Sequence, residues 1–163
     1  MNDVVIIVTG GTLDKVHDVF TEALTFDKED GTQVPEILAQ GRCAYPRVLQ
    51  ILQKDSLDFD DADRMAIITA IQGTDEHTIV VTHGTGTMGQ SARLAAQHIT
   101  DKTVVFTGAM RPHSLGKSDG SFNLGGALIA AQTLPVGVYG VMNGRVFEAH
   151  NLNKNTKQGR FDI

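Results

Sequence analysis

The chain has 163 residues, a formal net charge of −5 and a single cysteine, Cys43. This length suits one compact domain over residues 1–163, with a core that needs neither a disulfide nor a metal ion. The negative charge argues against a general nucleic-acid surface, and the lone cysteine excludes an internal disulfide and fits a reducing compartment. No apolar run approaches the ~20 residues of a membrane span, and Met1-Asn2-Asp3 lacks the layout of a signal peptide. We therefore expect a cytoplasmic protein without a membrane or nucleic-acid partner.

Apolar β-branched runs alternate with segments of helical period along the chain. In chain order, the predicted elements are a strand at 3–9, a helix at 35–40, a strand at 47–52, a helix at 61–72, a strand at 78–82, a helix at 88–99, a strand at 103–107, a helix at 122–132, and strands at 136–142 and 145–148. On the helix at 88–99 we expect Leu94, Ala95 and His98 to share one face. The dipeptide Asn143-Gly144 is a turn signal between the last two strands.

Two loops interrupt this pattern. Residues 10–32 are polar and contain glycine, with a short hairpin expected around 19–26, and residues 108–121 form the second loop. A loop as long as the first is usually functional or mobile inside a compact domain. The alternation of strands and helices predicts an α/β fold with three layers, in which right-handed crossovers cover both faces of a mostly parallel sheet of the flavodoxin or Rossmann type.

Two Thr-Gly segments each follow a buried strand. Thr9-Gly10-Gly11-Thr12 follows the first strand, and the segment 82–88 follows the strand at 78–82. Ligands of α/β sheets bind outside the carboxyl ends of the strands, so the two segments predict one cleft with a hydroxyl nucleophile beside backbone N–H groups. The alternative is structural: a tight Gly-Gly-Thr turn, and N-capping by Thr85 and Thr87, which we prefer for Thr87.

Three further polar positions each allow two interpretations. His83 is either a general base or, as we prefer, a packing histidine at a strand end. Asp55-Ser56 either binds a substrate carboxylate or serves helix entry. Lys154 is either a solvated surface charge or a partly buried amine that takes a proton from a hydroxyl.

Metal and nucleotide sites lack their usual patterns. The six histidines and one cysteine show no metal-ligand spacing, so we expect no metal. No GxGxxG follows the first strand and no GxxxxGK[ST] occurs in the sequence, which weakens nicotinamide and P-loop readings and leaves no cofactor to expect.

Taken together, the motifs resemble the bacterial-type L-asparaginase family of threonine amidohydrolases. The resemblance extends along most of the chain, in the family's order. The similar segments are Thr9–Thr12, Lys54–Asp58, Thr82–Met88, Gly108–Pro112, Ser118–Gly120, Phe122–Leu124, and Met142-Asn143 followed by Lys154.

The resemblance implies hydrolysis of the side-chain amide of asparagine, or of a related small amide, to the acid and ammonia. Thr12 would attack the amide, and Thr85, assisted by Lys154, would be the second threonine of the site. The segment with Asp55 and Ser56 would bind substrate, with Ser56 on the α-carboxylate. Position 86 and the backbone of Gly11 and Ala109 would complete the substrate site. The resemblance also implies no cofactor, and a homo-oligomer.

Two departures from the family pattern stand out. Gly86 replaces an Asp that, in the family, links the Thr–Lys pair and holds the substrate α-ammonium; Asp14 and Asp119 are candidates to replace it. The chain is also short, like single-domain members; we read its length as natural, with a truncated chain as the alternative, and expect loop 13–32 or another subunit to close the site. His17 stands near the place of a family tyrosine and either supports the nucleophile or is an exposed loop residue.

Two rival functions remain at this point. Because of Gly86, the alternative hypothesis is a catalytically weakened or inactive member that binds an amino acid or carboxylate as a sensor. A nucleotide- or phosphate-binding α/β domain is the third reading. The sequence does not rank asparagine against glutamine or other amides.

Overall fold

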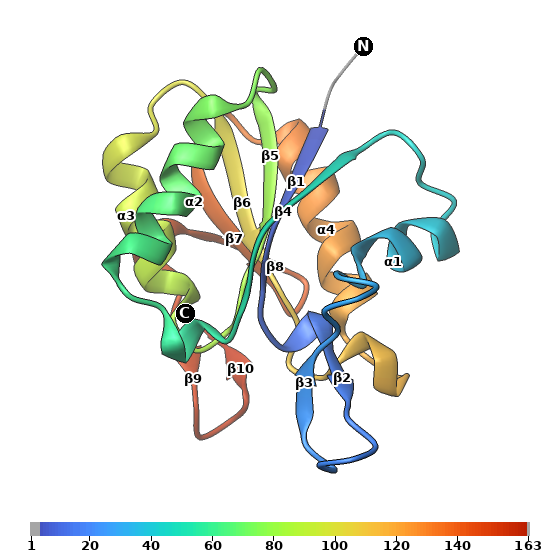
Figure 1. The fold of residues 1–163 in the computed structure, drawn as a ribbon. Helices are drawn as coiled ribbons and strands as arrows, with labels where there is room; N and C mark the ends of the chain where they lie inside the picture. Colours follow the sequence, from blue (N-terminus) through green and yellow to red (C-terminus); the bar gives the residue numbers. More distant parts are fainter. Residues whose placement is uncertain (1–3, 163) are drawn as a thin grey trace.

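The computed structural model describes residues 4–162, which contain a six-stranded sheet with the strand order β4-β1-β5-β6-β7-β8 (Figure 1). The strands are β1 (Val4–Gly10), β4 (Arg47–Lys54), β5 (Thr78–Thr82), β6 (Thr103–Thr107), β7 (Gly137–Met142) and β8 (Arg145–Glu148). The first five are parallel, and β8 pairs antiparallel with β7. The five parallel strands follow the flavodoxin-like order 2-1-3-4-5. The predicted mostly parallel α/β sheet is thus confirmed.

Helices cover both faces of the sheet (Figure 1). On one face, α2 (Asp61–Gly73) and α3 (Met88–His98) share an apolar cluster with the strands; on the other, α1 (Val34–Gln40) and α4 (Gly120–Thr133) form the second cluster. Burial on both faces explains why β1 is apolar along its length, since side chains of either parity enter a core.

The predicted helices and strands are confirmed, and their observed ends differ from the predictions by at most two residues. Residue 3 of the first predicted strand lies outside the described residues, as do Met1, Asn2 and residue 163. The start of α2 has a clear chemical cause. Asp60 accepts from the backbone N–H of Asp63, and Asp63 accepts in return from Asp60, which makes a capping box.

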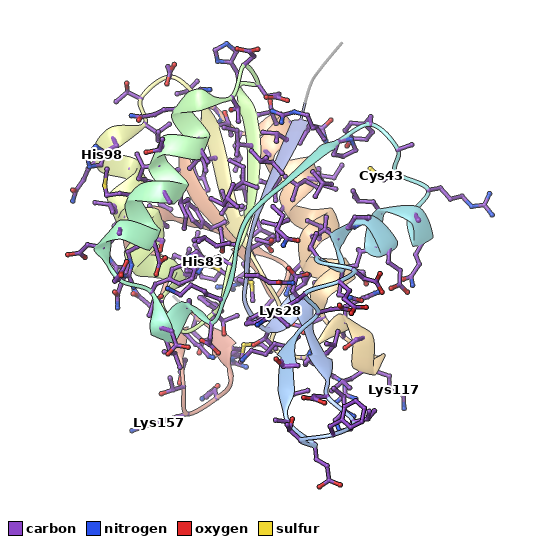
Figure 2. All side chains as sticks on the ribbon, in the orientation of Figure 1. Lys28, Cys43, His83, His98, Lys117 and Lys157 are labelled. Atoms are coloured by element: carbon purple, nitrogen blue, oxygen red, sulfur yellow. The ribbon has the colours of Figure 1, made fainter. Side chains whose placement is uncertain are left out.

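Three local predictions need correction. The hairpin expected around 19–26 is formed by β2 (Lys15–His17) and β3 (Leu24–Phe26), so it begins earlier. The loop at 108–121 contains a 3-10 turn, η3 (His113–Leu115). On α3 the predicted face is wrong at His98, which is exposed at the outside of the molecule (Figure 2). The buried face instead consists of Met88, Ser91, Ala92 and Ala95.

The polar C-terminal stretch is ordered as a second hairpin, β9 (Lys154–Asn155) with β10 (Arg160–Phe161). Phe161 is buried and packs at 6.3 Å from the ring of Phe147. Asn143, in the turn after β7, accepts from the backbone N–H of Phe161 at 2.8 Å. These contacts fix the hairpin that carries Lys154. Figure 1 shows both hairpins extending beyond the same end of the sheet.

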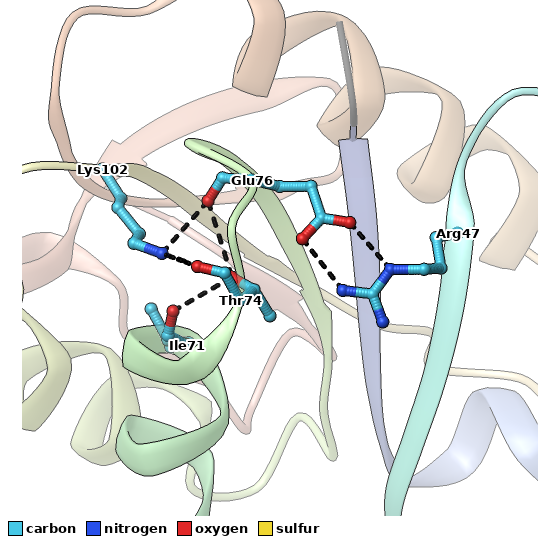
Figure 3. Close-up of polar contacts among 5 residues, drawn as sticks. All are labelled: Arg47, Ile71, Thr74, Glu76 and Lys102. Carbon is cyan, nitrogen blue, oxygen red and sulfur yellow. Dashed lines mark hydrogen bonds and ion pairs between the residues drawn. The ribbon is translucent and has the colours of Figure 1, made fainter.

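The opposite end of the sheet, where the parallel strands begin, is held by a polar cluster (Figure 3). The buried Lys102 donates to the carbonyls of Thr74 and Glu76, and Arg47 makes two bonds of 2.7 and 2.9 Å to the Glu76 carboxylate. The cluster joins the turn before β5 to the first residues of β4 and β6. No helix within residues 4–162 is both long and apolar enough to cross a membrane.

Candidate active site

The site lies where the strand order reverses. From β1 the chain crosses to β4 on one side, and β5 pairs with β1 on the other side. Loops at the carboxyl ends of strands diverge at such a switch point and leave a crevice. The loop after β1 carries Thr12, and the loop after β5 carries Thr85.

Glycine lets the first two loops touch. Gly11 has φ +80°, and a Cβ placed on it would lie 2.5 Å from the backbone nitrogen of Gly84. Only glycine permits this approach. The N–H of Gly11 donates to the carbonyl of Lys54 at 3.0 Å. The backbone of Gly11, which we expected in the substrate site, therefore uses its N–H to hold two loops together. Thr12 and Thr85 each directly follow a residue of this contact.

The loop after β6 joins the same group. A Cβ on Gly108 would collide with the carbonyl oxygen of His83. Ala109, the next residue, is buried, and the N–H of Met110 donates to the Asp119 carboxylate at 2.9 and 3.0 Å. Ala109 thus lies in this cluster of loops, and its role in binding substrate stays a prediction.

Lys154 reaches Thr85 from the C-terminal hairpin. Its Nζ donates to Thr85 Oγ1 at 2.9 Å, across 69 residues of sequence. Thr85 is buried and Lys154 is half-buried. Among the hydrogen bonds of residues 4–162, none is donated by the backbone N–H of Thr12 or of Thr85. Thr85 and Lys154 thus form a hydrogen-bonded hydroxyl–amine pair, and the loop that carries Thr12 touches the loop that carries Thr85.

Asp55 brings a negative charge close to this amine. Its Oδ2 accepts from Lys15 Nζ at 2.6 Å, and its other oxygen accepts from the N–H of Leu57 at 3.0 Å. Burial acts to raise the pKa of Asp55, but these hydrogen bonds and the charges of Lys15 and Lys154 outweigh it and lower the pKa. Asp55 is therefore a carboxylate in the site. Lys15 was not anticipated, because its partner lies 40 residues away in sequence.

Ser56 couples the segment after β4 to the start of α3. Its buried hydroxyl oxygen accepts from the N–H of Thr87 at 3.2 Å, and its carbonyl accepts from Thr87 Oγ1 at 2.9 Å. The N-capping role preferred for Thr87 is therefore wrong, since its hydroxyl bonds to Ser56 and caps no N–H of α3. The helix-entry interpretation of Asp55 is confirmed, because its side chain caps the 3-10 turn η2 (Ser56–Asp58), and substrate binding by Asp55-Ser56 stays a prediction.

Gly86 is exposed and lies beside Leu57. A Cβ on Gly86 would be 2.7 Å from Leu57 Cδ2 and 3.5 Å from Ser56 Oγ. Neither acid suggested as a replacement for the missing Asp is free for this role. Asp119 is bound by the backbone N–H groups of Met110 and Arg111.

Asp14 is buried against the opposite end of its own loop. Its Oδ1 accepts from Thr32 Oγ1 and from the N–H of Gln33, both at 2.8 Å, and its Oδ2 has no partner. Burial raises the pKa of Asp14 to about 6, against the lowering effect of these hydrogen bonds. Asp14 therefore ties the loop after β1 to the start of α1.

The two candidate histidines differ in environment. His17 is exposed on β2, where it pairs with Leu24, and its support of Thr12 stays a prediction. His83 is buried inside the molecule (Figure 2), with its ring edge-on to Phe59 and Phe106. Burial lowers the pKa of His83 to about 4.

His83 has both ring nitrogens occupied. Nδ1 lies 2.7 Å from the carbonyl of Gly84, which can only accept, so Nδ1 carries the proton. Nε2 then accepts from Ser91 Oγ at 2.7 Å. The structure supports the packing interpretation and shows that His83 fixes the backbone next to Thr85.

Comparisons with known proteins agree with this geometry. A family model described as "Asparaginase, N-terminal" matches residues 3–162. The chain is 29% identical to a glutaminase-asparaginase of Acinetobacter glutaminasificans over 170 residues, covering 94% of this chain and 50% of the relative. It is 30% identical to L-asparaginase 2 of Escherichia coli over 160 residues, covering 93% and 46%.

Solved structures show the same fold. The thermostable L-asparaginase from Thermococcus kodakarensis superposes with a TM-score of 0.76 at 23% identity, over 90% of this chain and 46% of that one. The chain thus spans about half the length of the curated relatives it matches. On the family model's match, this chain belongs to the asparaginase family, in the part that corresponds to its N-terminal domain.

Proposed function

We propose that this chain hydrolyses the side-chain amide of L-asparagine, or of a related small amide, to the acid and ammonia. Thr12 is the nucleophile, and Thr85 with Lys154 forms the proton-transfer pair. The observation that carries the proposal is the 2.9 Å hydrogen bond between Lys154 and Thr85 beside the contact of Gly11 with Gly84. Family membership supports amidohydrolase chemistry in general.

The proposed reaction has two steps. Thr12 Oγ attacks the amide carbon, the C–N bond breaks with proton transfer to nitrogen, and ammonia leaves an ester on Thr12. Water then cleaves that ester, which releases the carboxylic acid and restores the hydroxyl. The open N–H groups of Thr12 and Thr85 are suited to hold the oxyanion of each tetrahedral intermediate.

Thr85 and Lys154 exchange the protons that these steps require. Their hydrogen bond connects an amine to a hydroxyl inside a partly buried site. Asp55, bound to Lys15, keeps a negative charge close to Lys154. In this proposal Ser56, whose position is fixed by Thr87, binds the substrate carboxylate near the start of α3, where a helix favours negative charge.

The direct test is ammonia release from L-asparagine, and from L-glutamine in parallel, by the wild type and by Thr12→Ala. We expect Thr12→Ala to lose roughly 1,000-fold or more in kcat, as removal of a nucleophile does. Thr100→Ala is the matched control, because Thr100 is exposed after the end of α3. Activity that survives Thr12→Ala unchanged would defeat the nucleophile assignment.

A second candidate is a binding protein without turnover, which the absence of an acid at Gly86 favours. In this case the chain would act as a sensor that binds an amino acid or another small carboxylate. Calorimetry with L-aspartate and L-asparagine separates the two functions. Binding without ammonia release supports the sensor, and turnover supports the hydrolase.

The proposal includes a cytoplasmic homo-oligomer. The free, half-buried Cys43 is compatible with a reducing compartment. Exposed apolar side chains of α4 and β8, namely Phe122, Ile129 and Val146, line a groove that suits a protein contact. Light scattering of the purified chain measures the mass, and a monomer at all concentrations would contradict this part.

A further inference from the structure

Positive charge exceeds negative charge around Thr85. Lys154 donates to Thr85, and Lys15 lies beside it through their common neighbour Asp55. One carboxylate therefore faces two ammonium groups, and that carboxylate is already bound at 2.6 Å to Lys15. The first turn of α3 adds a partial positive charge, because its peptide N–H groups favour a negative ligand.

The surface next to Ser56 is apolar. The Leu57 side chain is 73% exposed and lies against Gly86, which itself has no side chain. A ligand carboxylate held at Ser56 would therefore have Leu57 and the Gly86 backbone as its neighbours. Nothing in this pair can accept a hydrogen bond through a side chain.

Two other acids come close in sequence to the loops of the site. Asp58 follows Leu57, is exposed, and its carboxylate accepts no hydrogen bond within residues 4–162; its charge acts on Lys54, whose pKa it helps to raise after the larger effect of Asp63. Asp14 is buried against Thr32 and Gln33. Among residues 4–162, the atoms nearest to a Cβ on Gly86 belong to Leu57 and Ser56, and none of them is a carboxylate oxygen that could meet a cationic group of a ligand.

We propose, on the basis of the proposed function, that Leu57 and Gly86 select amides which carry a carboxylate but no ammonium group beside it. The substrate class is the monoamides of small dicarboxylic acids. Succinamate is the simplest probe, because it is asparagine with hydrogen in place of the α-ammonium. The ammonium of asparagine would leave water for an apolar surface next to two lysines, whereas succinamate presents only the charge that the site attracts.

The test compares kcat/KM for succinamate and L-asparagine with the same ammonia readout. We expect the wild type to prefer succinamate by roughly tenfold or more, since an unmet charged group costs about that much in binding. Gly86→Asp should move the ratio toward L-asparagine by roughly 10- to 100-fold. A wild type that prefers L-asparagine overturns this inference and leaves the proposed function standing.

Two further variants make the comparison sharp. Gly73→Asp adds the same charge at the exposed last residue of α2, with no atom within 4 Å of the new Cβ, and should leave the ratio unchanged. The double variant Leu57→Ala with Gly86→Asp gives the carboxylate room, because a Cβ at 86 meets Leu57 at 2.7 Å. If neither variant with Asp at position 86 moves the ratio more than Gly73→Asp does, the inference that Leu57 and Gly86 select the substrate is wrong.

A binding measurement keeps the inference testable without turnover. If neither amide is hydrolysed, the proposed function fails, and calorimetry of the wild type with succinate and L-aspartate then decides the ligand class. Tighter binding of succinate supports the inference. Equal binding, tighter binding of L-aspartate, or no binding of either acid overturns it.

Discussion

Two buried titratable residues, Asp14 and His83, flank the reactive loops and respond to pH with opposite signs. The pKa of Asp14 is raised from 3.8 to about 6, so the folded state loses stability as pH rises through this range. The pKa of His83 is lowered from 6.5 to about 4, so the folded state loses stability as pH falls from 6.5 toward 4. Each effect is on the order of 3 kcal/mol, and the two largely cancel.

A variant that lacks one of these two residues should therefore show the pH dependence of stability that the other one causes. In Asp14→Asn, which keeps an acceptor for Thr32 and Gln33, the free energy of unfolding should fall between pH 6.5 and 4.5 because His83 acts alone. In His83→Gln it should rise over the same interval because Asp14 acts alone. Urea unfolding at both pH values measures the two slopes. Equal slopes in the two variants would show that one of these pKa shifts is wrong.

Single residues were the hardest part to predict from sequence. The Thr-Gly segments, Ser56 and Lys154 carried recognisable motifs, so their neighbourhood could be expected. Lys15 and Leu57 carry no such signal, because their partners Asp55 and Gly86 lie far away in sequence. His98 was placed on the wrong face, since its spacing from Leu94 fits a helix face that the tertiary packing leaves exposed.

Whole elements were predicted well where burial leaves a strong pattern. Strands covered on both faces appear as apolar β-branched runs, and β1, β5 and β6 therefore had clear boundaries. The hairpin β9–β10 gave no such pattern. It is held by the burial of Phe161 in the apolar cluster on the side of α2 and α3 and by the bond from Phe161 to Asn143, both at long range.

The polar cluster at the opposite end of the sheet allows stability to be tested apart from activity. Lys102→Met removes the donor shared by the carbonyls of Thr74 and Glu76 (Figure 3). Unsatisfied buried carbonyls cost about 1–3 kcal/mol each, so we expect a clear fall in Tm. The kcat at 25 °C should not change, because the cluster lies where the strands begin. Lys28→Met, at an exposed lysine, should change neither quantity.

A large loss of kcat in Lys102→Met, at a temperature where the variant is fully folded, would contradict the claim that this end of the sheet affects stability and not activity.

At the scale of the whole molecule, the strand order explains why distant segments meet. The flavodoxin-like order brings the ends of β1 and β5 together at the switch point, and two hairpins extend past the same edge (Figure 1). Alternation of elements in the sequence predicts a parallel sheet, but it does not state which strands are neighbours. That order, and the anchoring of Lys154 over Thr85, came from the structure.

The groove on α4 and β8 gives a prediction for assembly. Ile129 is 63% exposed, and a charge there should weaken any contact made through this groove. We expect Ile129→Lys to shift the mass measured by light scattering toward the monomer while the circular dichroism spectrum stays the same. Gln97→Lys, at an exposed position of α3, is the control. An unchanged oligomer in Ile129→Lys would place the contact elsewhere.

The most direct test of the site compares two lysines of one hairpin in the same assay. Lys154 bonds to Thr85, whereas Lys157 is exposed at the tip of β9–β10 (Figure 2). With ammonia release from L-asparagine and succinamate as the readout, Lys154→Met should lose roughly 100-fold or more in kcat, as loss of a proton-transfer group does. Lys157→Met should retain the wild-type rate. Equal rates in the two variants, or a wild type that releases no ammonia from either amide, would contradict the account.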